Sequence, residues 1–150
     1  MSITRRDVVS FLPAAFCLTA ALPGLATAAE EQAVSLPSAV YPFESLPVHE
    51  SLHVTTRHIL KGKLATGEAV EVHETTLPPG GAPHAPHNHV HTEMWLIREG
   101  TVEITIEGKP HRIGPGSLAI VRSNEEHGIT NPTDKPANYF VVAIGPGADK

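Results

Sequence analysis

Cysteine, cationic residues and uninterrupted apolar sequence are all scarce in this chain of 150 residues, and each shortage excludes a class of protein. The single cysteine, Cys17, rules out a framework of intramolecular disulfides. The 11 Lys and Arg residues stand against 16 Asp and Glu residues, which gives a formal net charge of −5. Nucleic acids and anionic membranes need a basic face, so neither is expected as a partner. The 12 glycines and 14 prolines disfavour long helices.

The most apolar segment near the N-terminus, residues 8–22, is shorter than the ~20 residues that a membrane-spanning helix needs. It follows Arg5 and Arg6 and is followed by Ala26-Thr27-Ala28, a small-x-small sequence. A cationic head, an apolar middle and a small-residue exit together predict a secretory signal peptide over residues 1–28. An uncleaved N-terminal anchor is the alternative.

Residues 4–9 resemble the twin-arginine export signal, although Val8 and Val9 stand where Phe and Leu are commoner. We therefore expect a partner in the export machinery, a periplasmic or secreted protein, and no stable membrane anchor after cleavage. Removal of residues 1–28 takes away Cys17, so that the mature chain has no cysteine, and keeps all ten histidines.

Short strands separated by turn residues make up the pattern of the mature chain. Val102, Ile104 and Ile106 alternate with polar residues, which is the period of a half-buried strand. Eight segments are predicted as strands: 52–60, 69–77, 90–99, 101–106, 111–113, 118–121, 127–131 and 138–144. Many short strands without a helical period predict an all-β sandwich or barrel. We assign residues 29–51 to an N-terminal arm and 52–150 to one β-barrel domain.

Both faces of the segment 90–99 are apolar, because Met94 and Leu96 alternate with Trp95 and Ile97. Such a strand needs cover on both sides. One side can meet the barrel core, and the other can meet the arm or a second subunit. We expect a homodimer.

Histidine is the residue type present in excess, with 10 in the chain. His87, His89 and His91 are spaced two apart, and in a strand such residues share a face with Cα atoms about 6.6 Å apart. Two imidazoles at this spacing can reach one metal ion, and Glu93 would add a carboxylate. A helical pair of zinc ligands is excluded, because Pro83 and Pro86 immediately precede the cluster.

These residues match the first motif of the cupin superfamily at every fixed position: Gly81-x5-His87-x-His89-x3-Glu93-x6-Gly100. The chain resembles this family over roughly residues 52–144. The resemblance implies a double-stranded β-helix (jelly-roll) barrel.

The second cupin motif is present with its spacing intact, as Gly116-x5-Arg122-x-Asn124-x2-His127-x3-Asn131. Arg122 replaces proline, which we expect to loosen the turn and to bring a positive charge near the barrel. Asn124 replaces glycine, a mild change, since asparagine tolerates the left-handed conformation better than most residues.

By resemblance, the ligands of one divalent transition metal are His87, His89, Glu93 and His127. Mn, Fe, Ni, Cu and Zn all accept such ligands. The resemblance implies a metal-dependent enzyme acting on a small oxygen-rich molecule, with a quercetinase-like dioxygenase favoured over decarboxylases, isomerases and lyases. Glu93 would then also be the general base. The alternative is a non-catalytic cupin that binds a metal or a small ligand.

The remaining polar and aromatic candidates are less specific. His73, His91 and Tyr139 are candidates for contacts to the substrate or to the metal ligands, and His84 lies in the loop before His87. Four histidines have no supporting neighbours in the sequence and are expected on the surface or in the core: His49, His53, His58 and His111.

Overall fold

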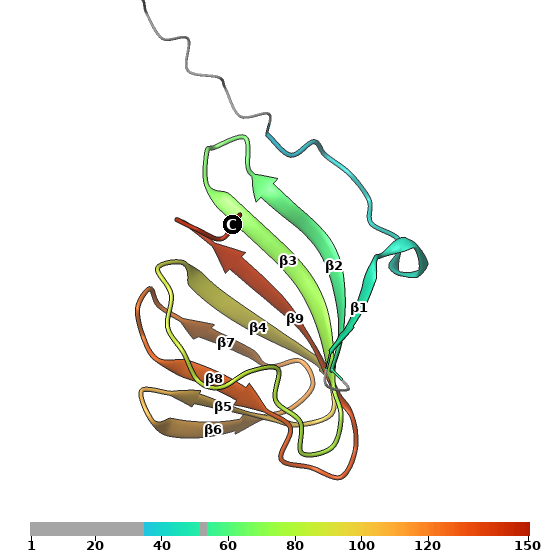
Figure 1. Cartoon of the computed structure of the whole chain (residues 1–150), viewed down its shortest axis with the longest axis vertical. Helices are drawn as coiled ribbons and strands as arrows, with labels where there is room; N and C mark the ends of the chain where they lie inside the picture. The colour runs from blue at the N-terminus through green and yellow to red at the C-terminus, as the bar shows by residue number, and fades with distance from the viewer. Residues whose placement is uncertain (1–34, 52–53) are drawn as a thin grey trace, which may run out of the picture. The chain divides into compact units, whose positions relative to one another are not determined.

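The computed structural model describes residues 35–51 and 54–150 (Figure 1). The predicted signal peptide, with Arg5, Arg6 and Cys17, lies outside these residues, as does His53. In the described ranges no helix has the length and apolarity to cross a bilayer. The elements are η1 (Phe43–Ser45), a 3₁₀ turn, and the strands β1 (Val48–Ser51), β2 (Val54–Lys63), β3 (Ala69–Leu77), β4 (Thr92–Glu99), β5 (Val102–Ile106), β6 (Lys109–Ile113), β7 (Leu118–Val121), β8 (His127–Thr130) and β9 (Ala137–Ile144).

The strands form two antiparallel sheets. The larger has the order β1-β2-β3-β9-β4-β7, and the smaller has the order β6-β5-β8 (Figure 1). The predicted all-β class is thus confirmed. β3 and β7 have the predicted bounds, whereas β2 runs three residues further than predicted. The ladder continues there because Gly62 and Lys63 still pair with Val70 and Ala69, so the strand does not end at residue 60 as predicted.

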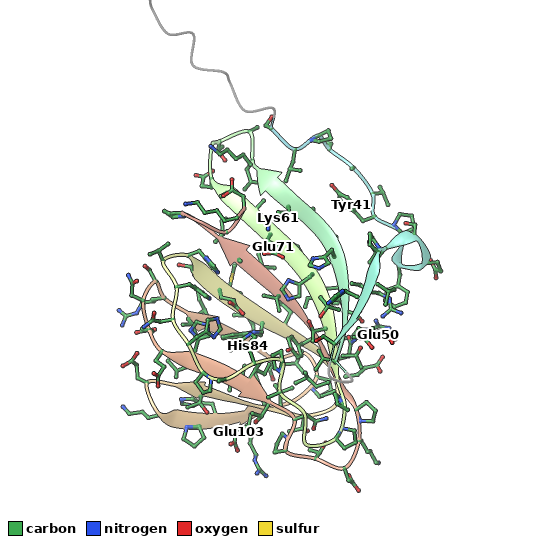
Figure 2. All side chains as sticks on the ribbon, in the orientation of Figure 1. Tyr41, Glu50, Lys61, Glu71, His84 and Glu103 are labelled. Atoms are coloured by element: carbon green, nitrogen blue, oxygen red, sulfur yellow. The ribbon has the colours of Figure 1, made fainter. Side chains whose placement is uncertain are left out.

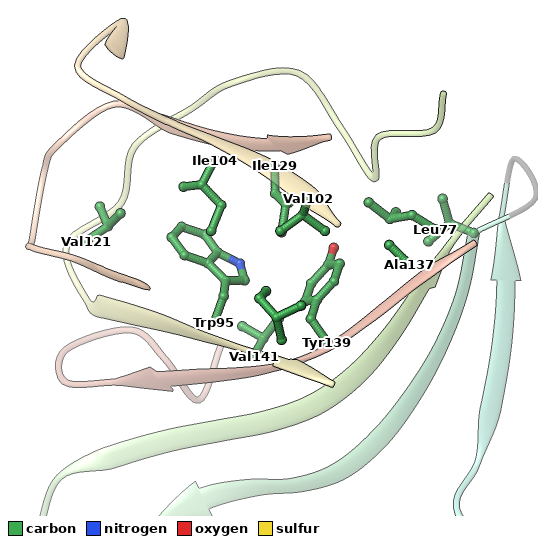
Figure 3. Packing of buried hydrophobic residues seen from close by; sticks show 11 residues of the cluster. Leu77, Trp95, Val102, Ile104, Val121, Ile129, Ala137, Tyr139 and Val141 are labelled. Atoms are coloured by element: carbon green, nitrogen blue, oxygen red, sulfur yellow. The ribbon is translucent and has the colours of Figure 1, made fainter. Parts of the chain in front are cut away.

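The core lies between the two sheets. Trp95 on β4 and Tyr139 on β9 project from the large sheet towards Ile104 and Ile129 on the small one (Figure 3). All four side chains are buried, and each points inward from its strand. Large apolar side chains on every second residue therefore fill the space between the sheets.

Phe43 of η1 lies on the outer face of the large sheet. The Phe43 ring lies 4.5 Å from the guanidinium carbon of Arg57 and 5.7 Å from that of Arg98. Both guanidinium groups are 3.5 Å from carboxylate oxygens of Glu74, which is 1 % exposed and also accepts a hydrogen bond from Asn138. A buried carboxylate needs such compensation, and the aromatic ring covers the two cations that provide it.

The two apolar faces of β4 have different surroundings. Trp95 and Ile97 are buried in the core, as expected for one face. On the other face Leu96 is 41 % exposed, beside Leu118 and Ile120 on β7, which are 56 % and 53 % exposed. Within the described residues this outer patch (Leu96, Leu118 and Ile120) remains open to solvent.

Asn131, the last position of the second motif, has a structural role. It is 1 % exposed, and its amide nitrogen donates to the carbonyls of Pro78 at 3.0 Å and of Lys135 at 2.7 Å. Its amide oxygen accepts from the backbone N–H and the hydroxyl of Thr133 at 3.0 and 2.8 Å. The side chain thus joins the loop after β3 to the loop between β8 and β9.

Gly100 ends β4 in a conformation that only glycine adopts without strain. Its φ is +74°, and a Cβ atom would lie 2.6 Å from the carbonyl oxygen of Pro136 and 2.8 Å from Cα of Ala137. Close approach of two backbone segments therefore explains the glycine at this motif position.

Candidate metal centre

The two motifs meet through their backbones. The N–H of His87 donates to the carbonyl of His127 at 2.9 Å, and the N–H of His127 donates back to the carbonyl of His87 at 2.8 Å. Pro86 packs against Gly128, where a Cβ atom would lie 3.1 Å from the proline ring. The loop before β4 is thereby fixed to the start of β8.

Three imidazoles face one another at this junction. The ring centroids of His87 and His89 are 5.3 Å apart, and both lie close to His127, at 4.7 and 4.6 Å. One ligand atom from each ring lies within 4.8 Å of the others. Glu93 on β4 completes the group, since its Oε2 is 2.8 Å from Nε2 of His89 and 3.8 Å from Nε2 of His127. The structure therefore brings together all four residues expected as ligands.

In two of the rings, a hydrogen bond at Nδ1 determines that Nε2 is the nitrogen available to a metal. Nδ1 of His89 lies 3.0 Å from the carbonyl of His91, and Nδ1 of His127 lies 2.8 Å from the carbonyl of Glu125. A carbonyl only accepts, so both Nδ1 atoms carry the proton and both Nε2 atoms present a lone pair to the centre.

These lone pairs fit a bound cation. Nε2 of His127 is buried without a hydrogen-bond partner, and Nε2 of His89 faces a carboxylate oxygen, another acceptor, at 2.8 Å. Burying an unpaired acceptor and opposing two acceptors are both unfavourable unless a cation or a proton lies between them. Three imidazole nitrogens and a carboxylate oxygen suit a first-row divalent metal ion.

The turn of the second motif supports two of these ligands. Asn124 has φ +65°, which confirms the expected left-handed conformation, and its N–H donates to the carbonyl of His89 at 2.8 Å. The carbonyl of Glu125 holds His127.

The prediction that Arg122 loosens this turn is wrong. Its backbone N–H donates to Oε2 of Glu125 at 3.2 Å, and its guanidinium donates to Oε1 at 3.0 Å. These bonds lower the pKa of the Glu125 carboxyl. The arginine therefore braces the turn through an ion pair, and its charge is directed to solvent rather than to the barrel.

A cavity of about 300 Å³ opens beside the ligands, a size at the small end of ligand sites. Glu93 and His127 form part of its wall, and Tyr139 lines it from the core. Burial, followed by the negative charge of Glu93, raises the pKa of the Tyr139 phenol. The phenol therefore stays protonated at neutral pH. The other lining residues are His49, Ser51, Val54, Thr56, His73, Thr75, Pro83, His84, Trp95, Gly128, Ile129 and Val141.

The three further candidates all lie near this cavity. His73 and Tyr139 line it. His91 stacks on His89 with centroids 3.5 Å apart and an interplanar angle of 16°, and His89, His91 and Glu93 form a second group of three potential ligands. Burial lowers the pKa of His91, and it also lowers the pKa of His87, which favours the neutral imidazoles that bind metals.

Two of the four histidines expected on the surface or in the core, His49 and His58, are exposed as expected. In addition, His49 lines the cavity from β1, and His58 lies beside Glu71 and His73. These positions follow from the register of the strands, which cannot be read from spacings in the sequence. His84 also lies closer to the site than its loop position indicated, because its ring meets that of His87 edge to face at 4.3 Å (Figure 2). His111 is exposed on β6.

Part of the chain is similar in sequence to known proteins. Residues 73–143 match the family described as Cupin domain. The chain is 32 % identical over 75 residues to an L-ectoine synthase of Bordetella petrii, an alignment that covers 49 % of this chain and 54 % of the relative. The chain thus spans about half the length of the curated relatives it matches first.

Solved structures share the fold. A predicted oxalate decarboxylase from Thermotoga maritima matches with a TM-score of 0.61 at 21 % identity, over 71 % of this chain and 99 % of that one. An RmlC-like cupin from Shewanella frigidimarina matches with a TM-score of 0.62 at 16 % identity, over 75 % and 96 %. The expected double-stranded β-helix is confirmed.

Proposed function

We propose that this protein is a metal-dependent enzyme acting on a small oxygen-rich molecule, because the residues of its two cupin-like motifs converge on one group of potential ligands. The observation that carries the proposal is the unpartnered Nε2 of His127, buried beside Glu93 at the wall of a cavity. His87, His89, Glu93 and His127 would hold one divalent Mn, Fe, Ni, Cu or Zn ion.

The chain's own residues supply the rest of the site. A divalent ion held by these residues would supply Lewis acidity towards a substrate oxygen. Tyr139, a protonated phenol, donates a hydrogen bond to a substrate oxygen inside the cavity. Glu93 accepts a substrate proton when one of its oxygens is released from His89. Trp95 and Val141 keep the inner wall apolar.

The reaction type is proposed at two levels. The broader level is Lewis-acid chemistry on adjacent oxygen atoms of the substrate. The name of one relative, a synthase, favours an enzyme over a binding protein. The finer level, which we favour, is a quercetinase-like dioxygenase, in which the bound metal is also redox-active. A non-catalytic cupin that binds a metal or a small ligand is the second candidate, favoured by the small volume of the cavity.

One panel experiment separates these functions. Metal-loaded protein is mixed with flavonols, 1,2-diketones and small dicarboxylates such as oxalate, while oxygen uptake, carbon dioxide release and loss of substrate are recorded. We expect turnover of at least one substrate above about 1 per second, the low end of ordinary enzymes. Oxygen uptake would select the dioxygenase, and carbon dioxide release without oxygen uptake would select a decarboxylase. Thermal stabilisation by a compound that is not converted would instead favour the binding protein.

We also propose export by the twin-arginine route, on the basis of Arg5 and Arg6 ahead of the apolar segment and the Ala-x-Ala exit. Replacing both arginines by lysine keeps the charge and removes the pair that the pathway reads. We expect the variant to stay in the cytoplasm of a bacterial host with its N-terminus uncleaved, as judged by fractionation and intact mass. Normal processing of the variant would contradict this route.

We further propose that a second copy of the chain covers the outer patch. Leu96, Leu118 and Ile120 lie side by side on β4 and β7 and are each about half exposed. The exchange Ile120→Glu places a charge in this apolar contact, and we expect it to shift the protein from dimer to monomer in sedimentation velocity. Lys109→Glu, at an exposed position on β6, is the control. A monomeric parent protein at micromolar concentration would exclude the dimer.

A further inference from the structure

A second group of titratable side chains lies beside the cavity, outside the proposed metal ligands. Glu71 and His73 are on β3, and His58 is on β2, where it pairs with His73. Nδ1 of His73 and Nδ1 of His58 lie 3.6 and 3.7 Å from the same oxygen, Oε1 of Glu71. The two rings are 6.0 Å apart between centroids.

The strand register explains how this group forms. Glu71 and His73 are two apart on β3 and so share one face of the large sheet. On β2 a register shift follows His58, so that the next pairing after His58 with His73 is Leu60 with Val72. Such irregularities re-aim side chains. Figure 2 shows Glu71 on β3 next to Lys61 on β2.

The group connects the cavity with solvent. His73 lines the cavity, and its Nδ1 is buried without a hydrogen bond. Glu71 is about one-fifth exposed, and the His58 side chain is 56 % exposed. A line from the cavity to bulk water therefore passes through an imidazole, a carboxylate and a second imidazole.

His73 is separate from the proposed metal site. On β3 it pairs with Val141 of β9, which pairs in turn with Trp95 of β4. Two apolar residues therefore lie next to His73 across the sheet, on the neighbouring strands β9 and β4. Its nearest acidic neighbour is Glu71, whose pKa is lowered first by its interaction with His73. The other titratable groups around this part of the cavity are Lys61, His91, His49, Glu93, His127 and Tyr139.

We propose that His73 exchanges a proton with the substrate, that Glu71 orients His73 and relays the proton, and that His58 passes the proton to water. This inference rests on the proposed enzymatic function. Glu71 selects the tautomer of His73 with the proton on Nδ1, which leaves a lone pair on Nε2. Catalytic hydrogen bonds that are long in the free enzyme tighten when substrate is bound, and we expect these two contacts to do so.

The transfer moves one proton and no electrons. A substrate O–H or C–H bond breaks, and its proton binds Nε2 of His73 while the electron pair stays on the substrate. The imidazolium then releases its Nδ1 proton to Oε1 of Glu71. His58 takes that proton on Nδ1 and releases the proton of its Nε2 to water. Reversal of the path returns a proton to the product.

The first test measures the protonation of His73 directly. Zinc(II)-loaded protein labelled with ¹⁵N-histidine is titrated by NMR, and Glu71→Gln is compared with the parent and with the control His111→Gln. We expect the parent to show His73 protonated on Nδ1 only. Loss of the carboxylate should mix the two neutral tautomers of His73, since the partner that holds the proton on Nδ1 is then gone. A change in Glu71→Gln no larger than in the control would overturn the inference.

The second test uses the substrate found in the panel experiment. We expect His73→Gln to lower kcat about 100-fold or more with KM and metal content unchanged. His58→Gln should lower kcat mainly in dilute buffer, with recovery on addition of imidazole. If the parent turns over a substrate and His73→Gln is equally fast, this inference alone fails. If the parent turns over nothing in the panel, the proposed function fails and the proton transfer fails with it.

Discussion

The double variant His87→Ala, His89→Ala will retain less than about a tenth of the metal that the parent protein binds, which we expect to be near one equivalent per chain. Both rings point at the centre shared with His127, and two ligands are lost at once. Elemental analysis of protein purified after export measures this. A ligand present at about a thousand times its Kd stabilises a fold by ~4 kcal/mol, so the parent should also melt well above the variant when metal is supplied.

The matched control for this experiment is the double variant His49→Ala, His111→Ala. It removes the same number of imidazoles, one from the cavity wall and one from the exposed surface of β6, and neither belongs to the ligand group. We expect its metal content and its response to added metal to match the parent. Equal metal uptake by the ligand variant and the control would refute the assignment of the site.

Gly100→Ala will destabilise the fold by about 3–5 kcal/mol, which is exceptional for the addition of one methyl group. Part of this cost, about 1–2 kcal/mol, comes from the left-handed backbone that an alanine must adopt at φ +74°. The rest comes from the new Cβ atom, which would lie 2.6 Å from the Pro136 carbonyl oxygen and force the segment before β9 to move. Thermal unfolding followed by circular dichroism measures the loss.

Gly108→Ala separates the two contributions. Gly108 has φ +73°, almost the same backbone angle, and a Cβ atom there would meet nothing within 4 Å. We expect this variant to lose only the conformational part, about 1–2 kcal/mol. If the two variants lose equal stability, close approach to Pro136 has no role and the motif glycine is explained by its dihedral angle alone.

Short apolar segments between turn residues were sufficient to predict the strands 69–77 and 118–121, and the resemblance to the two cupin motifs selected the four side chains at the centre. Both signals are local properties of the sequence. Strand ends were less predictable: β2 continues through Gly62, because the ladder with β3 outweighs the weak preference of glycine against strands.

Contacts between distant strands could not be predicted in this way. The grouping of His58 with His73 depends on the pairing of β2 with β3 and on the register shift that follows it. In the sequence, Glu74 looks like an ordinary exposed polar residue of a strand. Only the fold shows that it is buried and that Arg57 and Arg98 compensate its charge. A single sequence contains no record of which residues face each other across a sheet.

The reciprocal backbone hydrogen bonds between His87 and His127 have a consequence for how tightly an ion is bound. The entropy of bringing the two motifs together is lost when the chain folds. Binding of the ion therefore does not lose it a second time, and the affinity is higher. A centre assembled in advance also discriminates by size and coordination angle, because rigid ligands cannot follow an ion of the wrong geometry. Selectivity among the divalent metals would then reside in the antiparallel bridge as much as in the side chains that it carries.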